Sequence, residues 1–60
     1  MKTLDEQIES AERELAMRKR VYLKWVVAGK MNWLKARHEI ECMESIIETL
    51  NRVATQPDSL

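Results

Sequence analysis

Residues that break helices are almost missing from this 60-residue chain. Its only glycine is Gly29, and its only proline, Pro57, lies close to the C-terminus. No proline therefore interrupts a helix before that point. No stretch shows the strict apolar–polar alternation of a half-buried strand. These absences argue against a β-rich fold and favour helices on both sides of Gly29.

Cysteines and long apolar runs are also scarce. Cys42 is the only cysteine, so the chain cannot form an internal disulfide, which fits a reducing compartment. The apolar runs are far shorter than the roughly 20 residues that span a bilayer. Residues 1–3 lead into acidic sequence rather than into the apolar core of a signal peptide. We expect a soluble cytoplasmic chain with no membrane partner.

Two segments have apolar side chains at steps of three and four residues, which is typical of helices. Thr3 and Glu6 match a capping box at the start of the first segment. Gly29 can end a helix in the left-handed conformation, and Asn32 can cap the next helix. We predict an all-α fold, an antiparallel two-helix hairpin with helices over about 4–28 and 33–54. Residues 1–54 form the hairpin domain, and residues 55–60 form a flexible C-terminal tail.

The recurring apolar side chains form one row on each predicted helix, which we call the seam. Tyr22 and Trp25 are expected to face Trp33 and Ala36 and to close the core beside the turn. The members assigned to the hairpin core or to a dimer contact are Leu4, Ile8, Leu15, Tyr22, Trp25, Trp33, Ile40, Met43, Ile47 and Leu50.

Three polar residues are candidates for chemistry, namely Arg18, His38 and Cys42. Arg18 interrupts the row, so its guanidinium either reaches solvent or pairs with an acid such as Glu44, Glu48 or one from a partner chain. His38 and Cys42 are one helical turn apart, but they fall on the outer face with no second pair of ligands nearby in the sequence. Two helices offer no pocket for a Cys–His nucleophile. We expect no metal, no cofactor and no enzyme activity.

The apolar stripe on each helix is wider than one neighbour can cover. A homodimer that forms a four-helix bundle covers it most simply. The alternative is a parallel coiled coil of continuous helices, and Gly29 followed by Asn32 argues against it. The residues that widen the stripe are Val21, Val26, Val27, Ile46 and Val53.

Charges are segregated although the net charge is zero, which argues against a general nucleic-acid-coating protein. Residues 18–37 hold seven bases and no acid, whereas residues 1–17 hold five acids and two bases, and residues 38–60 hold five acids and one base. Folding at Gly29 puts the bases around the turn, at the closed end, and most acids at the open end. Antiparallel packing of two hairpins would place basic ends beside acidic ends.

The closed end combines tryptophan, arginine and apolar area rimmed by charge, as binding hot spots do. We therefore assign it as the candidate partner-binding surface. The residues assigned to it are Arg20, Lys24, Trp25, Val27, Lys30, Met31 and Trp33.

Residues 11–50 also resemble a family of small helical proteins. The shared runs are E-R-E-L-x-M-R-x-x-V-Y-x-x-W-V over residues 12–26, G-x-M over residues 29–31 and A-x-x-E-I-x-x-M-E-x-I over residues 36–46. This pattern is similar to accessory proteins encoded by phages and prophages of proteobacteria, including early proteins of the exo–xis region of lambda-like phages. The resemblance covers about two-thirds of the chain and contains no catalytic signature.

The resemblance implies an early accessory protein of the host cytoplasm that influences host functions or the lytic–lysogenic choice. We expect it to act by binding a host or phage protein. One alternative is a nucleic-acid-binding modulator that uses the basic closed end, and another is a structural subunit of a helical assembly.

Overall fold

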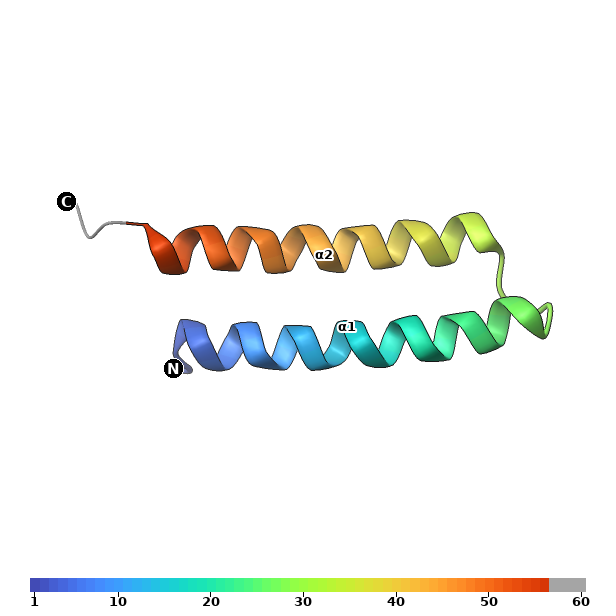
Figure 1. Cartoon of the computed structure of the whole chain (residues 1–60), viewed down its shortest axis with the longest axis horizontal. Helices are drawn as coiled ribbons and strands as arrows, with labels where there is room; N and C mark the ends of the chain where they lie inside the picture. Colours follow the sequence, from blue (N-terminus) through green and yellow to red (C-terminus); the bar gives the residue numbers. More distant parts are fainter. Residues whose placement is uncertain (57–60) are drawn as a thin grey trace.

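The computed structural model describes residues 1–56, whose backbone forms two helices. Helix α1 spans Leu4–Val27 and helix α2 spans Trp33–Thr55. The helices lie side by side and antiparallel, so that the N-terminus lies beside the last turns of α2 (Figure 1). The prediction of an all-α hairpin is confirmed, and the helix ends lie within one residue of those expected.

The first helix begins where its sequence can satisfy free amides. The Glu6 amide donates to the Thr3 hydroxyl at 3.1 Å, and the Thr3 amide donates to the Glu6 carboxylate at 3.0 Å. This reciprocal pair is the predicted capping box. Asp5 and Glu6 also place negative charge at the positive end of the helix dipole.

The core between the helices is small. Within residues 1–56, only Ala36, 1% exposed, and Met43, 8% exposed, are buried. The methyl side chain of Ala36 lets α1 approach closely near the turn. Half-buried apolar or aromatic side chains continue the core along both helices, namely Leu4, Ile8, Ala11, Leu15, Tyr22, Val26, Ile40, Ile47 and Leu50.

The C-terminal part of the chain departs slightly from the predicted boundary. Thr55 is the last helical residue and Gln56 is its C-cap, so the helix extends into the segment assigned to the tail. The rest of that predicted tail, residues 57–60, lies outside the described residues. Over the described range, neither helix combines the length and the apolar character that a membrane span requires.

Candidate functional site

The turn at the closed end is a compact helix terminus. Ala28 is the C-cap of α1, and Gly29 follows it with a φ of 73°. The Gly29 amide donates to the Val26 carbonyl at 3.0 Å, and the Lys30 amide donates to the Trp25 carbonyl at 2.8 Å. These two bonds define a Schellman motif, which satisfies carbonyls that the helix end would leave free.

The second helix starts at Trp33, four residues after Gly29. The Asn32 side-chain oxygen accepts from the Leu34 amide at 2.7 Å, which confirms the predicted cap. The connection between the helices therefore consists of residues 28–32, with hydrogen bonds from both helix ends. Such a connection holds the exposed groups around it in fixed positions.

The aromatic side chains at the closed end do not all enter the core. Trp25 is 46% exposed and its ring stacks on Tyr22, with centroids 5.9 Å apart and an interplanar angle of 29°. Trp33 is 59% exposed. Contrary to the expectation from the sequence, Trp25 therefore does not close the core of the hairpin. Val26, the next residue, is half-buried and takes the inward position.

A groove of about 190 Å³ runs between the helices at the closed end. Trp33 forms one of its walls from α2, and Leu23 forms another from α1. Trp25 does not line it, so the two tryptophans do not share one surface. The other lining residues are Lys19, Tyr22, Val26, Ala36 and Ile40.

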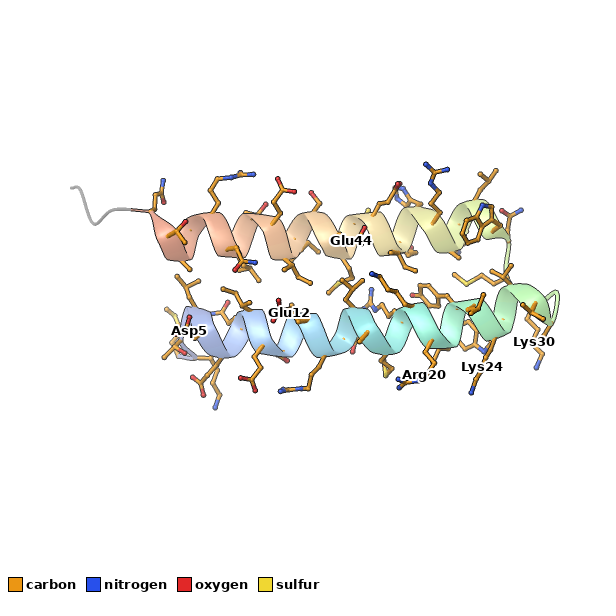
Figure 2. The ribbon with its side chains drawn as sticks, in the orientation of Figure 1. Asp5, Glu12, Arg20, Lys24, Lys30 and Glu44 are labelled. Atoms are coloured by element: carbon orange, nitrogen blue, oxygen red, sulfur yellow. The ribbon has the colours of Figure 1, made fainter. Side chains whose placement is uncertain are left out.

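Basic side chains surround this end of the hairpin. Three of the seven bases in residues 18–37 are in ion pairs, with Glu14, Glu44 and Glu41. Among the described residues the other four, Arg20, Lys24, Lys30 and Lys35, have no ion-pair partner. Arg20, Lys24 and Lys30 lie toward the turn, whereas Asp5 and Glu12 lie toward the open end (Figure 2).

Arg18 pairs within its own helix rather than with Glu44 or Glu48 of α2. Its guanidinium donates to the Glu14 carboxylate at 2.9 Å. This hydrogen bond raises the pKa of Arg18 above its ordinary value, and the charge of Glu39 on α2 acts in the same direction. Glu44 instead forms an ion pair with Lys19, with the two charged groups 3.4 Å apart.

His38 and Cys42 both lie on the exposed surface of α2, as their sequence positions predict. The Cys42 sulfur lies 3.5 Å from His38 Nε2. Among the described residues no group of three or more His, Cys, Asp or Glu side chains could hold a metal ion. The pair is therefore a local contact between neighbouring turns of one helix.

The residues assigned to partner binding all lie around the turn but on different sides of the hairpin. All are exposed except Met31, which is half-buried. Two exposed leucines, Leu23 at 62% and Leu34 at 70%, were not assigned to this surface from the sequence. Leu23 directly follows the seam residue Tyr22, and Leu34 directly follows Trp33, so a row that advances by three and four residues contains neither of them.

A second apolar depression lies on α2 beyond the closed end. Its lining residues are Cys42, Ser45, Ile46, Thr49 and Leu50. Ile46 is 50% exposed there. The sequence indicated Ile46 only as a residue that widens the apolar stripe.

No family model, curated protein or solved structure matches this chain, so its function is inferred from these surfaces.

Proposed function

We propose that this chain is a non-enzymatic accessory protein of the phage or prophage early type, which acts in the host cytoplasm by binding another protein. The observation that carries the proposal is the closed end. It exposes Trp25 and Trp33 beside four bases that lack an ion-pair partner among the described residues. The resemblance of residues 11–50 to phage accessory proteins supplies the biological setting.

The chemistry of the closed end suggests the kind of partner. Tryptophan and arginine carry much of the binding free energy at protein interfaces, because they combine large apolar area with polar contacts. The bases favour a partner whose surface is acidic around an apolar centre. The groove lined by Leu23 and Trp33 offers a place for one apolar side chain of such a partner.

Self-association is the second part of the proposal. A chain of this size buries only about 60% of its unfolded surface even when it is compact. Here the described hairpin buries only Ala36 and Met43. A homodimer with a four-helix core covers further apolar side chains without any other partner.

A nucleic acid is the competing partner, because unpaired bases can also contact phosphates. Binding of that kind weakens steeply as salt rises, since each neutralised phosphate releases counterions. Gel-shift titrations with DNA and RNA at two salt concentrations test this alternative. A salt-sensitive shift in the micromolar range would replace the protein-binding proposal.

The protein-binding proposal is tested by capture of partners from a proteobacterial host lysate. The test variant is Lys24→Glu, Val27→Ser, Lys30→Glu, which changes three exposed side chains at the closed end. The matched control, Lys2→Glu, Arg52→Glu, Val53→Ser, also replaces two bases by glutamate and one valine by serine, at the open end. We expect the first variant to fold normally and to lose the captured protein, while the control keeps it. Capture that survives in the first variant and fails in the control would overturn the assignment of the closed end.

A further inference from the structure

We propose that one face of the hairpin binds a second copy of this chain in antiparallel orientation, with Glu14 and Arg18 of both chains at the centre of the interface. The inference rests on the self-association proposed above, and it names the surface and the orientation. The face is called the Trp25 face. It includes Ala11, Glu14, Arg18, Val21 and Trp25 on α1 and Lys35, Glu39, Cys42, Ile46 and Thr49 on α2.

Helix geometry places these residues on one side of the hairpin. At about 100° per residue, these α1 members fall within a stripe of about 80°, and so do these α2 members. Each stripe lies beside the row that faces the core. On the other side of the two core rows, Lys19 of α1 and Glu44 of α2 lie 3.4 Å apart, so the two stripes share the remaining side. The ion pair between Lys19 and Glu44 belongs to the opposite side, which we call the Lys19 face.

The Trp25 face is the less charged of the two sides. It carries four charged residues, Glu14, Arg18, Lys35 and Glu39, and Glu14 and Arg18 are already paired with each other at 2.9 Å. The pair between Glu14 and Arg18 is also the least exposed of the five ion pairs within residues 1–56, with side chains 41% and 32% exposed. By the same helix geometry, the Lys19 face carries seven charged residues, namely Asp5, Glu12, Lys19, Arg37, Glu41, Glu44 and Glu48. A second copy would therefore desolvate fewer charges on the Trp25 face.

The positions along the helices also fit a two-fold axis. Helix α1 spans residues 4–27, so Glu14 and Arg18 flank its middle within one residue. Helix α2 spans residues 33–55, and Cys42 and Ile46 flank its middle, residue 44. If the axis crosses both midpoints, Glu14 of one chain opposes the partner's Arg18, and Ile46 opposes the partner's Cys42. Four charges then alternate around the axis, and the apolar side chain of Ile46 packs on a small neighbour.

The charge at the ends of the hairpin selects the antiparallel orientation. Arg20, Lys24, Lys30 and Lys35 lack an ion-pair partner among the described residues, as do Asp5, Glu6 and Glu12 of the open end. Antiparallel packing brings the basic closed end of one hairpin to the acidic first turns of the other. Parallel packing would bring the two basic ends together, and like charges would oppose it.

The area of the face is sufficient for a stable dimer. Helix α1 is about 36 Å long, and the hairpin is 18 Å wide across its Cα atoms. Their product is a footprint of about 650 Å² for each chain, so full contact over the face would cover about 1,300 Å² in total, which lies within the range of stable interfaces.

The first experiment locates the interface by sedimentation equilibrium of two variants, in each of which one exposed apolar side chain is replaced by glutamate. Ile46→Glu puts a carboxylate on the Trp25 face, and the matched control Leu23→Glu puts one on the Lys19 face. Both residues are at least half exposed in the hairpin, at 50% and 62%, so both variants should keep the helical content of the parent. We expect Ile46→Glu to raise the dimer dissociation constant roughly 100-fold and Leu23→Glu to change it less than about threefold. The reverse order would overturn the choice of face.

The second experiment separates a contact between chains from the bond within α1. Glu14→Arg and Arg18→Glu each create like charges at positions 14 and 18, and each should weaken self-association about tenfold or more. Mixing the two variants should restore association as a heterodimer, detected by native mass spectrometry, because arginines of one chain then oppose glutamates of the other. A bond within one helix cannot be restored by mixing. Absence of a preferred heterodimer would overturn the central role of these residues.

The third experiment measures orientation with a spin label at Lys30→Cys in a Cys42→Ser background. In the antiparallel dimer the two labels lie at opposite ends, about 40 Å apart at about 1.5 Å per residue from the helix midpoint. Parallel packing would place them within about 20 Å, and that result would overturn the orientation.

A parent chain that sediments as a monomer at micromolar concentration would instead remove the self-association itself. Partner capture through the closed end would be unaffected by that outcome.

Discussion

Lys19 and Glu44 form the ion pair that joins α1 to α2, with Nζ and the carboxylate oxygen 3.4 Å apart. The other four ion pairs within residues 1–56 each link positions i and i+4 of one helix. Electrostatic contact between the helices is therefore slight. Apolar contact around Ala36 and Met43 holds the hairpin together.

The Lys19–Glu44 pair should contribute little to stability. Its side chains are 53% and 49% exposed, so water and salt screen the attraction. In a double-mutant cycle with Lys19→Ala and Glu44→Ala, we expect a coupling free energy below about 0.5 kcal/mol, measured by urea unfolding. A coupling above about 1.5 kcal/mol would show that this pair, rather than the apolar core, positions the helices.

Substitutions in the core should have much larger effects. Ile40→Asp or Ile47→Asp puts a carboxylate into the half-buried row, and each should lower the free energy of unfolding by at least about 3 kcal/mol. A 60-residue domain has about 3–9 kcal/mol in total, so we expect these variants to be largely unfolded by circular dichroism. The exposed controls His38→Ala and Glu41→Ala should change the value by less than about 0.5 kcal/mol. Equal tolerance at all four positions would contradict the assigned core.

Gly29→Ala isolates the conformational requirement of the turn. No atom lies within 4 Å of the position that an added Cβ would occupy, so the substitution creates no clash. The φ of 73° is nevertheless unfavourable for a residue with a Cβ. We expect a loss of about 1 kcal/mol in chemical denaturation, with a smaller loss for Gly29→Asn. A neutral Gly29→Ala would mean that the helix end can form without the left-handed residue.

Thermal stability should depend on protein concentration. Because unfolding of a dimer separates its chains, dilution favours the unfolded state. We expect the Tm to rise by about 5 °C for each tenfold increase in concentration over the micromolar range, as followed by circular dichroism. A Tm that is independent of concentration, together with a monomer in sedimentation, would exclude the four-helix bundle.

Fluorescence quenching should distinguish the two tryptophans. In a Trp33→Phe variant the remaining Trp25 lies on the Trp25 face, so acrylamide quenching should fall by about half or more as the dimer forms. In the matched Trp25→Phe variant, Trp33 lies beside the groove on the other side, and its quenching should stay constant with concentration. Protection of Trp33 alone would point to the Lys19 face as the surface of association.

The helix boundaries were predictable because local chemistry fixes them. Thr3 with Glu6, Gly29, and Asn32 each satisfy backbone groups within a few residues of themselves. No partner element is needed to recognise these signals. The same locality explains why the two-helix fold could be predicted without any structural relative.

The inward position at the closed end was harder to predict. A step of three from Tyr22 leads to Trp25, and a step of four leads to Val26, so both continue the apolar row. Val26 lies 18 residues after Ile8, which is five full turns of a straight helix, and it therefore returns to the same side. Trp25 falls about 100° away, where it is 46% exposed. The partner of Arg18 was also different from the predicted Glu44 or Glu48. Pairing with those residues depends on the register of α2, whereas Glu14, one turn earlier on the same helix, is within reach in any register.

The short turn also has a consequence for the order in which the molecule assembles. Its five residues, 28–32, link the last turn of α1 directly to the first turn of α2. Closing so small a loop costs little chain entropy, and helical proteins rich in local contacts fold in microseconds to milliseconds. Encounter between two molecules at micromolar concentration is slower than that. Each chain should thus complete its own hairpin before it meets a copy, so the docking surfaces form in advance of the collision that uses them.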